Sequence, residues 1–132
     1  MSVKSLYGNI LPVLSLAPAA RVTGTLNGVS VDLQGFDSAV ATVAFGAYTD
    51  GVHTPKLQES DDNVTFADVE AEELDGSFAA VSSAGGAGSV QKVGYLGDAR
   101  YVRVVMGVTG ASTGALSAAQ VICGHPHHAP VA

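Results

Sequence analysis

Short runs in which apolar and polar residues alternate, separated by turn residues, recur along the chain. In residues 29–33, three aliphatic side chains alternate with Ser30 and Asp32, the period of a strand with one covered face and one wet face. Asn27 and Gly28, just before this run, form a strong two-residue hairpin signal. No segment carries apolar residues at helical spacing over three turns. The pattern predicts an all-β chain of about eight short strands.

The clearest local prediction is a hairpin over residues 54–69, TPKLQESDDNVTFADV. Its first strand ends near Ser60, and residues 64–66 resume the β-branched and aromatic content that strands favour. Asp61, Asp62 and Asn63 mark the reversal, because their short side chains hydrogen-bond nearby backbone. We expect this hairpin to pair with residues 100–108, RYVRVVMGV, the densest β signal in the chain.

Two further segments refine the fold class. Residues 39–48, AVATVAFGAY, are apolar on both parities, which predicts a strand buried on both sides, either centrally or under a partner subunit. Residues 79–89 are rich in Ala, Ser and Gly and predict a long loop of the kind that serves binding or assembly. About eight antiparallel strands in two sheets favour a jelly-roll-like β-sandwich, with an immunoglobulin-like sandwich as the alternative.

The domain organisation that we predict is one β-sandwich between two extended arms. The length of 132 residues fits one domain. Residues 1–20 are predicted to form the N-terminal arm, since Pro12 and polar residues interrupt their apolar run. The sandwich is predicted over residues 21–123, and the C-terminal arm over residues 124–132, where Pro126 favours an extended backbone. No stretch reaches the length of a membrane-spanning helix, so no membrane contact is expected.

The net charge argues against a nucleic-acid-binding protein, and the cysteine content argues against a fold held by an intrachain disulfide. The net charge is −6 with only six Lys and Arg residues, which argues against a nucleic-acid partner. Cys123 is the one cysteine and cannot form an intrachain disulfide. Because it follows Val121 and Ile122, we interpret it as a small buried hydrophobe.

The histidines are the first candidates for chemistry. They are His53, predicted in a turn, and His125, His127 and His128 near the C-terminus. A catalytic triad would need the tail to fold back over Cys123, and no Gly-x-Ser-x-Gly elbow accompanies it, so we predict no enzyme and no catalytic residue.

Metal binding is weighed at two places. The terminal His-Pro-His-His has no complementary ligands at finger spacing, so a docking arm is favoured, although an ion gathered across an oligomer axis stays open. Glu59, Asp61, Asp62 and Asn63 supply hard oxygen ligands, but the twelve-residue calcium-loop pattern is missing and a solvated turn is favoured. We predict no metal and no cofactor.

Arg103 is the one basic residue singled out as a contact candidate. It shares a strand face with Tyr101 and Val105. Pairing with Glu59 across the sheet is the first interpretation, and contact with an acidic partner is the second.

Two resemblances bear on function. LQESDDNVTFADV at residues 57–69, followed by RYVRVV at residues 100–105, is similar to a pattern in discoidin-like and other carbohydrate-binding β-sandwiches. Asn63 stands where Gly is common in that pattern, and Phe66 where Trp is common. The residues with which such modules hold sugar cannot be located here.

Over most of its length the chain resembles the small virion proteins of tailed bacteriophages, including jelly-roll cement or decoration proteins. The segments that carry this resemblance are TPKLQESDD, KVGYLG, RYVRVV and GHPHHAPV. It implies a protein that sits on the outer capsid surface of the virion, is assembled in the host cytoplasm, forms a homo-oligomer (dimer or trimer) and ties major capsid protein subunits together.

We therefore predict a structural virion protein that stabilises a phage capsid through its edges, its loop and its arms. The alternative is a carbohydrate-binding module, for which Tyr48 and Tyr95 are candidate aromatic platforms. The predicted partner-binding residues are Leu6, Tyr7, Ile10, Leu11, Val13, Leu14, Arg103, His125, His127 and His128.

Overall fold

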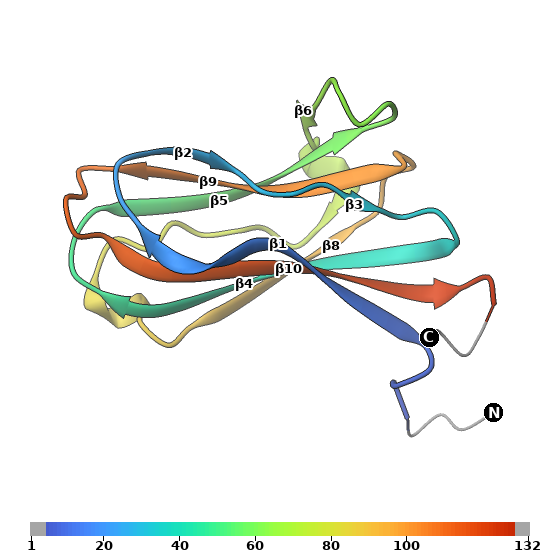
Figure 1. Cartoon of the computed structure of the whole chain (residues 1–132), viewed down its shortest axis with the longest axis horizontal. Coiled ribbons are helices and arrows are strands. Elements are labelled where there is room, and N and C mark those ends of the chain that lie inside the picture. The colour runs from blue at the N-terminus through green and yellow to red at the C-terminus, as the bar shows by residue number, and fades with distance from the viewer. Residues whose placement is uncertain (1–4, 129–132) are drawn as a thin grey trace.

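The computed structural model describes residues 5–128 and folds them into two antiparallel β-sheets that pack face to face (Figure 1). The strands are β1 (Ile10–Arg21), β2 (Gly24–Asn27), β3 (Val31–Asp32), β4 (Phe36–Tyr48), β5 (Val52–Ser60), β6 (Ala67–Asp68), β7 (Leu74–Asp75), β8 (Val90–Tyr95), β9 (Tyr101–Thr109) and β10 (Ala115–Pro126). Single 3-10 turns lie at Ala71–Glu73 and Ala84–Gly86. Over the described range, no helix has the length and apolarity needed to cross a membrane.

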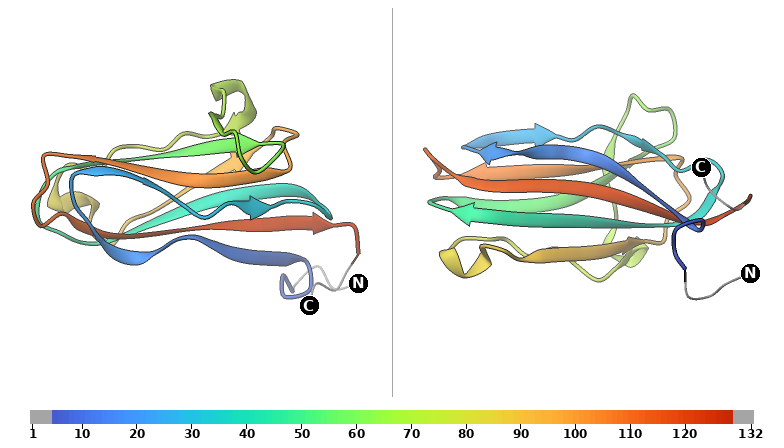
Figure 2. Two further views of the ribbon diagram at one scale, coloured as in Figure 1. Left: turned by 45° about the horizontal axis from the view of Figure 1, so that its top comes forward. Right: turned by 60° about the horizontal axis from the view of Figure 1, so that its bottom comes forward.

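The strand order is that of a jelly roll. The first sheet has the order β1-β10-β4-β8-β7, and the second has the order β2-β9-β5-β6 with β3 also paired to β9. Pairing is nested, because β1 pairs with β10, β2 and β3 with β9, β4 with β8, and β5 with β6. A long hairpin with this nesting, rolled so that β10 also meets β4 and β9 also meets β5, gives two sheets that share one core (Figure 2). The predicted antiparallel sandwich is confirmed, with ten strands in residues 5–128, of which three have only two residues.

The core between the sheets is aliphatic and closely packed. Its fully buried side chains include Val43 and Val121 from the first sheet and Val102, Val104 and Met106 from the second. They lie at alternate positions along their strands, as the period of two requires. Cys123 belongs to this core with no exposed surface, which confirms its prediction as a buried hydrophobe.

The pairing predicted for the two strongest segments is confirmed in part. β5 and β9 pair over their whole lengths, from Val52 with Thr109 to Ser60 with Tyr101. The prediction that the second strand of the hairpin covers residues 64–66 is wrong. These residues are not in a strand, and β6, which follows them, pairs back onto β5. Asp62 extends the turn, because its Oδ1 accepts hydrogen bonds from the backbone N–H groups of Val64 and Thr65.

Residues 39–48 lie in β4, a central strand between β10 and β8, which confirms the first of the two predicted settings. Its inward side chains are buried in the core. Its outward side chains are small or apolar and remain partly exposed, so the predicted burial on both sides is wrong for the single chain.

The predicted N-terminal arm over residues 1–20 is wrong for its second half. Ile10–Arg21 forms β1, an edge strand of the first sheet that pairs with β10. Pro12 and Pro18 do not prevent this, because an edge strand needs only one hydrogen-bonded side. The predicted C-terminal arm also begins too early, since β10 continues to Pro126. The ends of both predicted arms, residues 1–4 and 129–132, lie outside the described residues.

Asn27 and Gly28 do not form the predicted hairpin turn. β2 and β3 both pair with β9, so the two residues link consecutive segments on the same side of one strand. The Gly28 N–H donates to the Val104 carbonyl at 2.8 Å, and the Val29 N–H donates to the Ser15 carbonyl at 2.7 Å. The Asn-Gly pair therefore brings the two sheets together at one border of the sandwich.

Candidate partner-binding surfaces

The segment before β1 presents its two largest apolar side chains to solvent. The Asn9 N–H donates to the Leu6 carbonyl at 2.9 Å, which closes a turn over residues 6–9. Leu6 is 67% exposed and Tyr7 is 87% exposed. Both predicted contact residues are therefore accessible, and their partner stays a prediction.

The four predicted contact residues of β1 separate into two groups. Leu11 and Val13 are partly buried and pack against the core. Ile10 and Leu14 have the opposite parity and face outward, Leu14 with half of its surface exposed. Because Leu11 and Val13 face inward, Ile10 and Leu14 are the two residues of this group that a partner on the outside of the sheet would meet.

The C-terminal histidines dock on the start of β4 in their own chain. His125 Nδ1 lies 2.7 Å from Ser38 Oγ, and His127 Nε2 lies 2.7 Å from Asp37 Oδ1. The His127 N–H also donates to the Gly35 carbonyl at 2.8 Å. His128 is exposed. Across residues 5–128, the His, Cys, Asp and Glu side chains form no group of three that could hold a metal ion.

Arg103 contacts other side chains on the solvent side of the second sheet. Its Nε and Nη2 donate to Gln58 Oε1 at 3.0 and 2.7 Å, and its guanidinium lies 3.9 Å from the centre of the Phe66 ring. The predicted pairing with Glu59 is wrong by one position, because Gln58 is directly opposite Arg103 while Glu59 is opposite Val102. A one-residue difference in register moves a side chain to the other face of the sheet.

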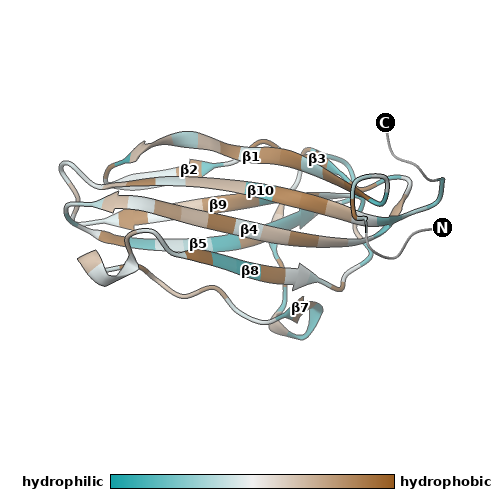
Figure 3. Cartoon of the chain, turned by 90° about the horizontal axis from the view of Figure 1, so that it is seen from below, coloured by the Kyte–Doolittle hydropathy of each residue, from teal (hydrophilic) through white to brown (hydrophobic). Residues whose placement is uncertain are grey.

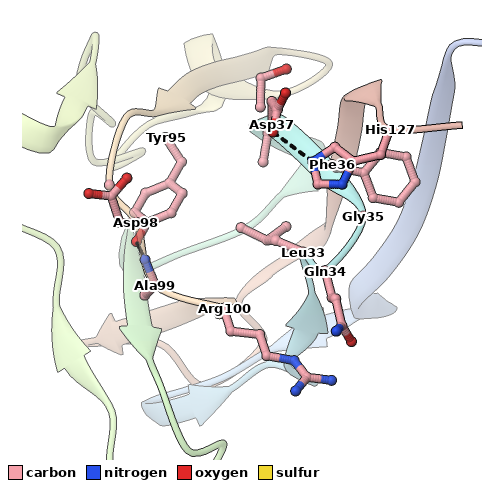
Figure 4. A pocket seen from close by; sticks show the side chains of 13 residues that line it. Leu33, Gln34, Gly35, Phe36, Asp37, Tyr95, Asp98, Ala99, Arg100 and His127 are labelled. Carbon is pink, nitrogen blue, oxygen red and sulfur yellow. Dashed lines mark hydrogen bonds and ion pairs between the residues drawn. The ribbon is translucent and has the colours of Figure 1, made fainter.

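A cavity of about 340 Å³ opens between the sheets at one end of the sandwich (Figure 4). Asp37 and His127 lie on one side of it, and Tyr95 and Asp98 on the other. Arg100 at its border donates two hydrogen bonds to Asp32, at 3.0 and 2.9 Å, and this contact lowers the pKa of Asp32.

Tyr95 closes the inner end of this cavity. Its hydroxyl donates to Glu59 Oε1 at 2.6 Å and accepts from the Ala99 N–H at 3.0 Å. Burial, followed by the hydrogen bond to Glu59, raises the pKa of Tyr95. These pairings within the chain use the Tyr95 hydroxyl, which lines the cavity, inside the fold.

Carboxylates crowd next to this end. The charge of Glu59 raises the pKa of Glu73, and burial, Asp98, Glu70 and Glu72 add to the effect in that order. The acidic side of the molecule is therefore concentrated around the Tyr95 end and the loop that carries β7.

The rings proposed as sugar platforms are not free to stack. Tyr95 is only 6% exposed. Tyr48 is half-buried, and its hydroxyl donates to the Gly51 carbonyl at 2.7 Å. Both rings are used at least in part inside the fold, which counts against their role as sugar platforms.

The outer face of the first sheet carries many apolar residues. Figure 3 shows hydrophobic colour along β1, β10 and β4 on this side. The strand register places the outward residues in rows across the sheet: Ile10, Gly124 and Ser38; Pro12, Ile122, Val40 and Gly94; Leu14, Gln120, Thr42 and Lys92; Ala118, Ala44 and Val90; and Ala20, Leu116 and Gly46. We call these residues the outer face. Lys92 is the one charged residue among them, and β7 adds Asp75 at the end of the row of Gly94.

Several outer-face side chains are well exposed. Leu14 is 50% exposed, Leu116 47% and Val90 69%. At one end, the segment from Ser5 to Asn9 and the edge of the sheet enclose a groove of about 1110 Å³, into which Val40 and Ile122 face. Apart from the polar row of Gln120, Thr42 and Lys92, the face is mostly apolar, and soluble monomers rarely leave large apolar surfaces uncovered, so this face is the leading partner-binding candidate.

Sequence reasoning missed the burial of His53. It lies in β5 and not in a turn, has no exposed surface, and packs edge-on against Phe45 and Tyr48 at ring-centre distances of 6.4 and 6.0 Å. Its Nε2 lies 3.0 Å from the Asp50 carbonyl. The signal was present, because His53 shares its parity with the buried Pro55 and Leu57.

Cys123 has no catalytic environment among the described residues. The side chain has no exposed surface, and burial raises the pKa of its thiol. A protonated, covered thiol is a poor nucleophile. His125, two residues along, hydrogen-bonds Ser38 instead.

Comparisons with known proteins give little beyond the geometry. No family model matches the chain, and no curated protein matches it. A solved structure of infectious bursal disease virus, Gx strain, is similar at 12% sequence identity and a TM-score of 0.32. The similarity covers 86% of this chain and 40% of that chain. The comparison thus supplies a weak structural neighbour from a virus.

Proposed function

We propose that this chain is a structural virion protein that binds the outer capsid surface of a tailed bacteriophage as a cement or decoration protein. Its partner is the major capsid protein, and it acts as a small homo-oligomer without catalysing a reaction. It is made and assembled in the host cytoplasm and stays on the virion.

The observation that carries this proposal is the uncovered outer face of the first sheet. A face with Leu14, Leu116 and Val90 about half exposed or more gains free energy when another protein covers it. The polar groups around the end cavity, by contrast, are largely paired with one another. The chain is therefore better equipped for contact with folded proteins than for holding a small molecule.

The exposed N-terminal segment supplies a second contact. Leu6 and Tyr7 project next to the groove at one end of the outer face. Apolar side chains on a short segment bind weakly alone, but several copies engaged on one lattice add up to stable attachment. This arrangement suits a protein that must hold neighbouring capsid subunits together.

The test uses particles of the phage whose genome encodes the chain. Particles are produced with the wild-type chain, with Leu6→Ser combined with Tyr7→Ser, and with Val64→Ser as a control at an exposed site elsewhere. We expect the wild-type chain and the control to co-sediment with particles, and the double variant to be depleted from them.

A second measurement asks whether attachment stabilises the shell. Particles that lack the chain should release DNA at a lower temperature than decorated particles. The proposal fails if the wild-type chain is found in no particle fraction, or if particles with and without it release DNA at the same temperature.

A further inference from the structure

The outer face of the first sheet offers a surface that a second copy of the same chain can cover. We propose that two chains pack outer face to outer face and form a dimer. This inference rests on the homo-oligomer in the proposed function and names the surface that forms it.

Charge favours a second copy as the occupant. The chain carries a net charge of −6, yet the charged residues along the outer face are only Lys92 and, where β7 continues the row of Gly94, Asp75. The crowded carboxylates around Glu73 lie outside these rows. One cation and one carboxylate leave the face without a net charge, so two copies can meet on this side without net repulsion between the faces.

The shape of the face permits close approach. Its middle is lined by small side chains, Ala44 and Ala118, with Gly46 in the adjacent row. Two sheets that present small and medium apolar side chains pack about 10 Å apart, with their strands nearly aligned. Leu14 and Leu116, on the flank of the face, can then contact the facing sheet.

The size of the face matches what a stable dimer needs. β1, β4 and β10 have 12, 13 and 12 residues. The fourth strand, β8, has 6 residues. At about 3.3 Å per residue and about 4.8 Å between strands, the four strands cover roughly 700 Å². Specific protein interfaces bury about 600–1,000 Å² on each partner, so the face is large enough.

The sheet edges are poorer sites for self-association. The edge strand β1 carries Pro12 and Pro18, which lack N–H donors. In β5, His53 and Leu57 bond Val81 and Val69 on the side away from β9, and Pro55 on that side has no N–H to offer. These two edges therefore resist strand addition.

The experiment measures the solution mass of the full chain by light scattering after size exclusion, and by sedimentation over a range of micromolar concentrations. The variants are Ala44→Glu at the centre of the face and Val90→Glu at its β8 border. Val64→Glu, on a residue 81% exposed in the β5–β6 turn, makes the same change as Val90→Glu away from the face.

We expect the wild-type chain and Val64→Glu to have twice the 13.2 kDa mass of one chain, and both face variants to have the mass of one chain. Circular dichroism checks that the variants remain folded, and Val90→Glu keeps the test valid if Ala44→Glu does not fold. A wild-type chain that is monomeric throughout, or a folded Val90→Glu that stays dimeric with Ala44→Glu, overturns the proposal.

The mass measurement is independent of the particle assay, so the two proposals can fail separately. A monomeric wild-type chain whose Val90→Glu variant is lost from particles would assign the face to a capsid subunit and would overturn the dimer. A dimer that is absent from particles would leave the face intact and overturn the capsid role.

Discussion

At the residue scale, Gly28 and Ser15 determine how closely the two sheets approach at one border. Ser15 is 2% exposed, its hydroxyl donates to the Val29 carbonyl at 2.9 Å and accepts from the Val104 N–H at 3.1 Å. A Cβ atom added at Gly28 would lie 2.5 Å from both Ser15 Oγ and the Val104 carbonyl oxygen. Only glycine leaves room for these hydrogen bonds.

The first prediction follows from this contact. Gly28→Ala should lower the free energy of unfolding by about 2 kcal/mol, because backbone and side chain must shift to admit the methyl group. Urea unfolding monitored by circular dichroism measures the change. Gly107→Ala is the control, since its nearest contact would be an ordinary 3.7 Å. Equal stability of the two variants would contradict the close approach.

At the element scale, β1 is formed by residues that were predicted to lie in an arm, and it joins the first sheet of the sandwich. Its inward Leu16 is 2% exposed and belongs to the core, while its outward Leu14 is 50% exposed. Between them, the register with β10 shifts, because Ser15 is an extra residue in the strand. The bulge directs the Ser15 side chain to the second sheet and keeps Leu16 in the core.

The second prediction compares the two leucines. Leu16→Ala should lower the free energy of unfolding by about 3 kcal/mol, because it leaves a cavity in the core. Leu14→Ala should change it by less than about 1 kcal/mol. Urea unfolding of both variants provides the measurement. If residues 1–20 were a loose arm, both substitutions would leave stability unchanged.

At the scale of the whole molecule, ionised carboxylates tie the turns to the sheets. Asp50 accepts hydrogen bonds from the backbone of Ser112, Thr113 and Gly114, with the Gly114 N–H at 2.6 Å, and so joins the β4–β5 turn to the β9–β10 turn. The Gly114 contact is the largest cause of the lowered pKa of Asp50. Asp62 is held in the same manner in the β5–β6 turn, where the Thr65 N–H lowers its pKa most.

The third prediction is loss of stability in acid. The folded-state pKa values of four aspartates, Asp32, Asp50, Asp62 and Asp68, lie below their ordinary value. Their stabilisation is therefore complete above about pH 4 and is lost as the pH falls through the lowered values. The raised pKa of Glu73 means that its ionisation destabilises the folded state, which opposes the effect of the four aspartates. Glu73 is a single group, so the aspartates dominate.

Urea midpoints measured between pH 7 and pH 2 test this prediction. The wild-type midpoint should fall below about pH 4, and Asp50→Asn should show a smaller fall because one of the contributing carboxylates is gone. Asp61→Asn is the control, an exposed carboxylate in the same turn as Asp62. A wild-type midpoint that stays flat down to pH 2 would contradict the role of these carboxylates.

Local patterns predicted the class of fold and several of its parts. The alternation of inward and outward residues in β9 and β10, and the turn residues between strands, follow from neighbours in the sequence. The pairing of residues 54–60 with 100–108 was also predictable, because both segments have strong strand composition. These features depend on side chains a few positions apart.

The remaining errors concern contacts between residues far apart in the sequence. Ser15 marked an interruption in the pattern, yet it is buried because Gly28 and Val104 meet it from the second sheet. Arg103 had two possible neighbours on β5, and only the register with β9 selected Gln58 over Glu59. Local composition carries no information about such pairings.

By itself, then, the sequence determined that the chain forms short antiparallel strands with an aliphatic core, because the period of two and the turn residues are local properties. Only the tertiary structure decided that β1 belongs to the sandwich and that the outward apolar residues of β1, β10, β4 and β8 form one continuous face. The physical reason is that a surface is made by strands that meet in space, and the nested pairing brings the first and last strands of the chain side by side.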